Sequence, residues 1–158
     1  MLQLDVDTSA INAIVEEFKA VAQTAVRPAA QAGAQVFYEQ VRMNVMGRPY
    51  SKTGNLLGAI YQVYSQDNSR DGVATYHVSW NKKRAPHGQL VEFGYLQKYQ
   101  VVFDPQTGRF RSLKNRPLAA PRQVPARPFL RPALSAEPRA VEAARRVLLR
   151  RIEERVPA

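Results

Sequence analysis

The residues best suited to chemistry lie in the segment HGQLVEFGY, from His87 to Tyr95. Histidine and glutamate are common general acids and bases in enzymes. Here His87 and Glu92 are five residues apart, a spacing that does not place them on one helix face as three or four would. No neighbouring serine or threonine has an evident activating partner, as a nucleophile would need. The segment therefore does not indicate catalysis, and the sequence predicts that the protein is not an enzyme.

Metal and nucleotide sites are also not indicated. The chain has no cysteine, which excludes disulfides, thiolate metal ligands and cysteine nucleophiles. The two histidines, His77 and His87, are ten residues apart and do not have the spacing of a zinc site. The TGN at 53–55 and the lone Gly108 lack the further glycines and the lysine of a phosphate-binding loop. We expect no metal and no cofactor.

Glu92 has a different possible role. It lies between Val91 and Phe93 in the apolar LVEFG segment, and a partly buried carboxylate needs a cationic or backbone partner. One interpretation is a solvated acid at the end of a helix. The other is a pairing with an arginine of the C-terminal segment, which would tie that segment to the core.

The elements that would position these residues begin with helices over 1–47. Apolar residues recur at helical spacing from 9 to 25, with Thr8 or Ser9 as N-cap, and again from 29 to 46 after Pro28. Because a proline interrupts the hydrogen-bond ladder without requiring a loop, the two stretches form either two helices or one long kinked helix.

A β-rich core is predicted over 53–112. The stretches 59–66 and 73–80 are rich in aromatic and β-branched residues and flank the turn cluster DNSRDG, which indicates a β-hairpin. In the second strand Tyr76, Val78 and Trp80 form the packed face, and His77 lies on the wetter face. A second hairpin is suggested by the strand 99–103 and the turn residues that follow it.

The last part of the chain is predicted to be an extended basic arm over 113–135, followed by a helix over 136–156. Five prolines lie between 117 and 132, and this density disfavours both helix and inner strand. The fold class is therefore α+β in a single domain, 1–158: N-terminal helices, an antiparallel β-hairpin core, a proline-rich extended arm and a C-terminal helix.

The net charge of +10 is concentrated in the second half of the chain. Residues 1–79 have a net charge of −1 and residues 80–158 a net charge of +11. Such a field attracts either nucleic acid or an acidic protein. The residues that could face DNA are Lys82, Lys83, Arg84, Arg109, Arg111, Lys114, Arg116 and Arg122.

A membrane role is not predicted. No apolar run reaches the roughly 20 residues that a membrane-spanning helix needs, and residues 1–7 carry two aspartates where a signal peptide would be basic. We expect a soluble protein that is not exported.

Three motifs in order, TGNLLGAI (53–60), HGQLVEFGY (87–95) and ARPFLRPAL (126–134), resemble the HK97 gp10-like family of tailed-phage head–tail connection proteins. With the terminal helices, the resemblance covers most of the chain. Two features depart from the family pattern: Tyr95 stands where threonine is common, and the stretch from 95 to 126 is longer and richer in proline.

The resemblance implies a structural virion protein of the neck, a tail-completion or head–tail joining subunit that is assembled in the host cytoplasm. Such proteins form rings around the DNA channel, here expected to be a hexamer, between the portal or adaptor proteins and the tail terminator or tail tube. The residues expected to contact neighbouring subunits are Glu92, Phe93, Arg127, Pro128, Phe129, Leu130 and Arg131. The alternative function is that of a free-standing basic nucleic-acid-binding protein, although the sequence contains no recognition-helix or finger motif.

Overall fold

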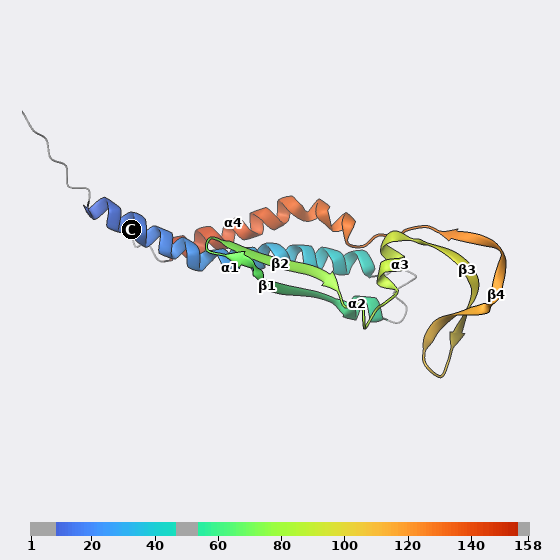
Figure 1. Cartoon of the computed structure of the whole chain (residues 1–158). Helices are drawn as coiled ribbons and strands as arrows, with labels where there is room; N and C mark the ends of the chain where they lie inside the picture. Colours follow the sequence, from blue (N-terminus) through green and yellow to red (C-terminus); the bar gives the residue numbers. More distant parts are fainter. Residues whose placement is uncertain (1–8, 47–53, 155–158) are drawn as a thin grey trace, which may run out of the picture.

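The chain combines helices with two separate antiparallel β-hairpins (Figure 1). The computed structural model describes residues 9–46 and 54–154. Its elements are α1 (Ser9–Val45), α2 (Asn55–Ala59), β1 (Ile60–Arg70), β2 (Val73–Trp80), α3 (Gly88–Phe93), β3 (Tyr95–Asp104), β4 (Arg109–Val124), the 3-10 helix η2 (Arg131–Ala136) and α4 (Glu137–Glu153). The predicted mixture of helices and antiparallel hairpins is confirmed.

The N-terminal helical region is one continuous helix, α1, which contains Pro28. A proline removes one hydrogen bond from the helical ladder and disturbs the preceding turn. Ala25 and Ala29, on either side of Pro28, are buried, so packing of this helix face offsets that loss. The structure thus has the single helix rather than two. The possible cap Thr8 lies outside the described residues.

The body of the molecule has three layers, with α1 between α4 and the β1–β2 sheet (Figure 1). α4 runs antiparallel to α1, and small residues allow the two helices to approach closely. A Cβ atom on Gly33 would lie 3.2 Å from the carbonyl oxygen of Ala140 and 3.6 Å from the Cβ of Ala144. The close approach places α4 along one side of α1 and leaves the opposite side to the sheet.

The β1–β2 hairpin follows the predicted pattern. Its register pairs Ile60 with Trp80 and Gln62 with Val78, and the face that contains these residues packs towards α1. His77 is exposed on the other face, as predicted. Where α1, this sheet and the C-terminal segment meet, the core is formed by Val41, Val45, Leu56, Ala59, Ile60, Trp80, Ala85, Phe129 and Ala133.

The proline-rich arm predicted over 113–135 is not found as one extended segment. Residues 113–124 belong to strand β4, which pairs with β3 over most of its length. Pro117 lies opposite Tyr99, where the register shifts on both sides. Prolines are tolerated because a two-stranded sheet has only edge strands and the bulges do not require a regular ladder. After Val124 the chain crosses to η2.

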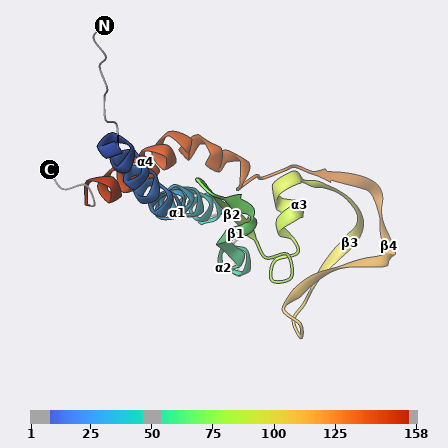
Figure 2. The same cartoon turned by 60° about the vertical axis from the view of Figure 1, so that its left-hand side comes forward.

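The β3–β4 hairpin projects from the body of the molecule (Figures 1 and 2). Its two strands pack mainly against each other, and neither makes an extensive contact with α1, α4, β1 or β2. It leaves the body at Gly94 and returns to it at 125–131. The body and the projecting hairpin are therefore joined through one short base.

Gly94 allows the two ends of the hairpin to meet. It has a φ of 72°, and a Cβ there would lie 2.6 Å from the carbonyl oxygen of Val124 and 2.7 Å from the nitrogen of Ala126. Gly108, in the distal turn, has a similar φ of 63° but nothing within 4 Å of such a Cβ. The two glycines share a positive φ and differ in packing.

We predict that Gly94→Ala destabilises the protein more than Gly108→Ala does. Each variant places a side chain at a positive φ, which costs about 1–3 kcal/mol. The Gly94 variant additionally forces backbone atoms apart, which costs a further ~1–3 kcal/mol. Urea denaturation of both variants measures the difference. Equal losses would show that the close approach at Gly94 is not required.

Candidate functional site

The candidate functional site is built around the buried carboxylate of Glu92. It lies on α3, a helix of under two turns that ends at Gly94, and only 1% of its surface is exposed. Among the described residues it is the single buried charged side chain. A charge removed from water in this way must be matched by donors.

Glu92 finds these donors in the segment that follows the hairpin. Its Oε2 accepts hydrogen bonds from the backbone nitrogens of Phe129 at 2.7 Å and Leu130 at 3.0 Å. Its Oε1 accepts from Arg131, through the backbone nitrogen at 3.2 Å and Nε at 3.1 Å. The Arg131 Nη2 also donates to the Glu92 carbonyl oxygen at 2.7 Å. We call Glu92 together with its donors on Phe129, Leu130 and Arg131 the Glu92 network.

Backbone donors are the main part of this network. Three successive N–H groups form a concave anion site of the type that binds carboxylates and phosphates. The Arg131 side chain is 56% exposed, so solvent screens its ion pair with Glu92. Burial alone raises the pKa of Glu92, but the hydrogen bonds from Leu130, Phe129 and Arg131 outweigh it, and the pKa lies below its ordinary value. Glu92 is therefore held as a carboxylate.

Phe129 is fixed on its other side by α1 and by the core. Its carbonyl oxygen accepts a hydrogen bond from Asn44 Nδ2 at 2.9 Å. Its fully buried ring meets the Trp80 ring edge to face, with centroids 5.6 Å apart. Gly88 makes room for the same indole, because a Cβ there would lie 2.4 Å from Trp80 Nε1. The HGQLVEFG segment thus contributes two glycines and one carboxylate to the base of the hairpin.

These contacts show that Glu92 is paired with the C-terminal segment and is not a solvated acid at the end of a helix. Both carboxylate oxygens accept hydrogen bonds from the chain itself, so the group is not placed to accept a proton from a substrate. The prediction that Glu92 ties the C-terminal segment to the core is confirmed by its bonds to Arg131 and its neighbours. Burial also lowers the pKa of the His87 imidazole below its ordinary value.

The residues predicted to contact other subunits fall into two groups. Phe129 is buried in its own core, so a subunit contact would require the segment to leave that core. Phe93 is 61% exposed, and the Arg131 guanidinium lies over its ring at 5.3 Å. Arg127 and Arg131 are exposed, whereas Pro128 and Leu130 are half-buried. Contact of these residues with a neighbour stays a prediction.

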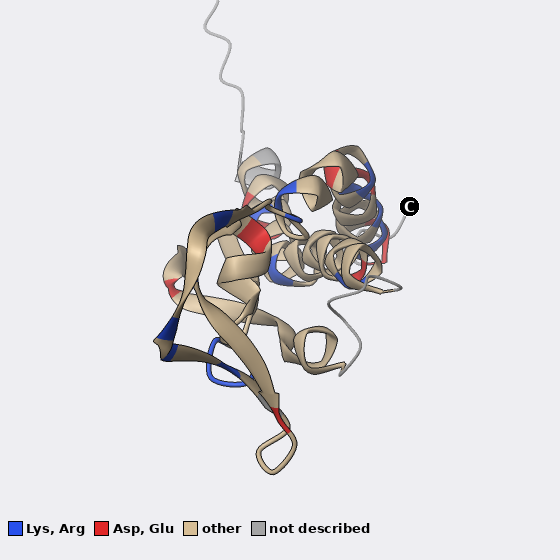
Figure 3. Cartoon of the chain, turned by 90° about the vertical axis from the view of Figure 1, so that its right-hand side faces the viewer, with Lys and Arg blue, Asp and Glu red and all other residues tan. Residues whose placement is uncertain are grey.

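The basic residues predicted to face DNA lie on two segments at the hairpin end of the molecule (Figure 3). Lys82, Lys83 and Arg84 are exposed on a turn that Asn81 stabilises, with its Oδ1 accepting from the backbone nitrogens of Lys83 and Arg84. The others belong to β4, where the side chains of Arg111, Lys114, Arg116 and Arg122 are exposed and Arg109 pairs in register with Asp104. What they bind is not determined by this placement.

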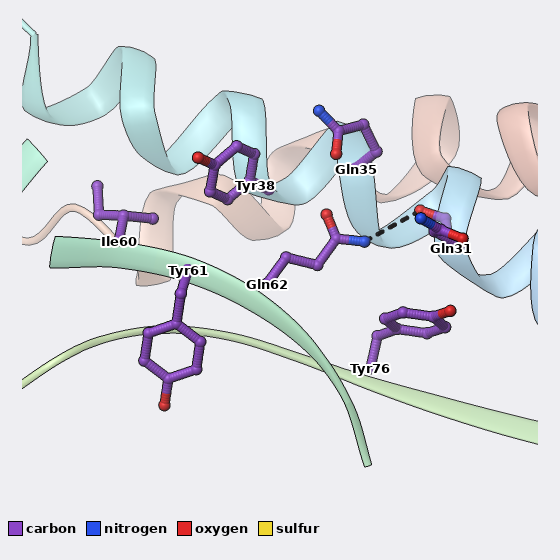
Figure 4. A pocket seen from close by; sticks show the side chains of 7 residues that line it. All are labelled: Gln31, Gln35, Tyr38, Ile60, Tyr61, Gln62 and Tyr76. Carbon is purple, nitrogen blue, oxygen red and sulfur yellow. Dashed lines mark hydrogen bonds between the residues drawn. The ribbon is translucent and has the colours of Figure 1, made fainter. Parts of the chain in front are cut away.

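An open groove lies between α1 and the β1–β2 sheet (Figure 4). It measures about 420 Å³ and is lined by Gln31, Gln35, Tyr38, Ile60, Tyr61, Gln62 and Tyr76. The Nε2 of Gln62 donates to the carbonyl oxygen of Gln31 at 3.3 Å across it. Its lining has amide, phenol and aliphatic groups but no carboxylate or imidazole, so it does not resemble an acid–base active site.

Within residues 9–46 and 54–154, no three His, Asp or Glu residues lie close enough together to hold a metal ion. None of the helices described there has both the length and the apolar character to cross a membrane.

Sequence reasoning missed three residues of this site. Asn44 lies within the predicted helical stretch 29–46, but its contact with Phe129 could not be predicted because the two residues are 85 positions apart in the chain. The sequence does not show that the Trp80 indole approaches Gly88 or that the backbone of 124–126 approaches Gly94. Its one indication is that two glycines lie on either side of Glu92 in a short motif.

Comparison with protein families gives one match. Residues 9–94, more than half of the 158-residue chain, match the family described as "Bacteriophage HK97-gp10, putative tail-component". The matched region runs from α1 to the end of α3 and includes Glu92 and Gly94, whereas β3, β4 and α4 lie beyond it. Searches of curated proteins and of solved structures give no match.

We predict that Glu92→Gln lowers the free energy of unfolding by about 2–4 kcal/mol, because the amide NH2 would face N–H donors that now bind an oxygen. Glu17→Gln is the matched control: Glu17 is exposed on α1, and a surface change of this kind stays within about 0.5 kcal/mol. Urea denaturation at neutral pH measures both. A Glu92 variant as stable as the control would show that the network contributes little.

The Glu92 network also predicts a dependence of stability on pH. Because the folded pKa lies below the ordinary value of 4.5, the network's contribution is fully present above that value and is lost as the pH falls through the folded pKa. Unfolding midpoints measured from neutral to acidic pH should fall for the wild type in this window. The same decline in Glu92→Gln would assign it to other carboxylates.

Proposed function

Because the chain belongs to the HK97 gp10-like family of bacteriophage tail components, we propose that it is the neck subunit that joins head to tail. In this role it assembles as a ring around the DNA channel, between portal or adaptor proteins on the head side and tail terminator or tail tube proteins on the other. Its place is the mature virion.

The observation that carries this proposal is the projecting β3–β4 hairpin. Isolated two-stranded hairpins are marginally stable in water and need a packing partner. This hairpin leaves large apolar side chains exposed, among them Phe110 at 70% and Phe103 at 52%. A surface of this kind marks a site of protein contact. A subunit whose main exposed feature is a projecting contact element suits an assembly better than a reaction.

The basic residues suit a position beside DNA. In a ring, the turn with Lys82, Lys83 and Arg84 and the exposed cations of β4 would line or approach the channel. Such contacts act on phosphates without reading sequence and weaken steeply with salt. The competing explanation is an acidic face on a neighbouring neck protein, which the same charges would bind.

The alternative, a free-standing nucleic-acid-binding protein, rests on the same positive charge alone. The family match favours the tail component, because it covers α1 and the β1–β2 sheet, which carry no nucleic-acid motif.

Electron cryo-microscopy of the neck in purified virions tests the proposal. We expect density for this chain in a closed ring between portal and tail tube, with the 82–84 turn and β4 towards the lumen. A ring with these cations turned to a protein neighbour would keep the joining role and reject the DNA contact. Absence of the chain from the particle would reject the proposal.

A further inference from the structure

The distal part of the β3–β4 hairpin has one uncharged face. Its register pairs Phe103 with Phe110 and Val101 with Ser112. Alternate positions of a regularly paired strand share one face of the sheet, so these four residues lie on the same side. The rings of Phe103 and Phe110 are in contact, with centroids 5.1 Å apart. The face extends from the middle of the hairpin to its tip.

The opposite face has a different character. The intervening pairs are Gln100 with Leu113, Val102 with Arg111, and Asp104 with Arg109. The charged residues of the paired distal strands therefore occupy positions on this second face, and the aromatic residues occupy the first. The hairpin as a whole, 95–124, has six basic residues and one acidic residue, a net charge of +5.

The body offers a second uncovered sheet face that is also uncharged. On the side of β1–β2 away from α1, Tyr61 pairs with Ser79, Val63 with His77 and Ser65 with Thr75. Figure 4 shows the Tyr61 side chain on the far side of β1 from α1. Tyr61 and Val63 are 41% and 47% exposed, and no other element of the described chain packs extensively against this face.

Charge favours contact of β3–β4 with β1–β2 of another copy over contact between two β3–β4 hairpins. Two β3–β4 hairpins would bring +5 against +5, whereas β1–β2, residues 60–80, has a net charge of −1, with Asp67 and Asp71 at its turn. A polyanion would approach the basic face of β3–β4 and leave the aromatic face uncovered. Within one chain the two faces cannot meet, because the hairpin projects away from the body (Figures 1 and 2).

We propose that the aromatic face of β3–β4, formed by Val101, Phe103 and Phe110, packs on the outer face of β1–β2 in a second copy of this chain. Two twisted two-stranded sheets then form a small sandwich between subunits, with the uncharged faces inside. Because the two patches differ, each copy gives one and receives the other. Such a heterologous contact closes into a ring when the rotation allows it. The inference rests on the proposed function and names the contact that builds its ring.

Directed cross-linking tests this contact. Because the chain has no cysteine, only the introduced thiols can react. Two single variants, Val63→Cys and Phe110→Cys, are purified separately, checked for folding by circular dichroism, mixed at high concentration and treated with a short bismaleimide. Each chain has one thiol, so any link between positions 63 and 110 joins two copies. Leu149→Cys, a 44% exposed apolar position on α4, replaces Val63→Cys in the control mixture.

We expect a linked dimer from the 63 and 110 mixture, identified by mass spectrometry of the joined peptides, at several-fold higher yield than from the control. Links only between two copies of position 110, equal yield with position 149, or no link in the mixture would each overturn the proposed contact. The joining function fails separately, through absence of the chain from the virion neck. A neck ring without the 63–110 link would keep the function and reject this packing.

Discussion

The structure depends on the requirement that a buried carboxylate be fully hydrogen-bonded. Glu92 lies on a helix too short to be stable alone, in a position that solvent does not reach. Its oxygens are satisfied only when residues 129–131 are brought to it from the far side of a 30-residue excursion. Every other feature at the base of the hairpin serves this contact: the two glycines that permit close approach, the amide of Asn44 and the aromatic pair of Trp80 and Phe129.

This arrangement separates two parts of the molecule with different sources of stability. The body is held by packing of α1 against α4 and against the β1–β2 sheet, with an apolar core where α1, the sheet and residues 129–133 meet. The β3–β4 hairpin has its own ladder of hydrogen bonds but no comparable core. Its geometry relative to the body is fixed through its base. The family match ends at residue 94, where the hairpin begins, and includes neither the hairpin nor η2 and α4.

Local signals allowed much of the fold to be predicted from the sequence. Helical spacing found the N-terminal and C-terminal helices, and alternation found both strands of the first hairpin with the correct packed face. The second hairpin was predicted, but the part of β4 from 113 to 124 was missed, because proline density is a strong local signal against strand and does not reveal pairing with a distant strand. For the site, the partner class of Glu92 was predictable from the cost of burying a charge. The identity of its donors was not predictable, because three of them are backbone N–H groups and side-chain types do not reveal which backbone groups donate.

The chain has one tryptophan, Trp80, and it is packed against Phe129 beneath the base of the hairpin. Its Nε1 is buried and has no hydrogen-bond partner in the described structure. Among the described tyrosines, Tyr95 and Tyr99 lie on β3, and the other four lie on α1, β1 and β2. Intrinsic tryptophan emission therefore reports on the body and on the base of the hairpin. The strands of the hairpin contain no tryptophan, so a spectroscopic probe of a change within them has to be introduced on the hairpin itself.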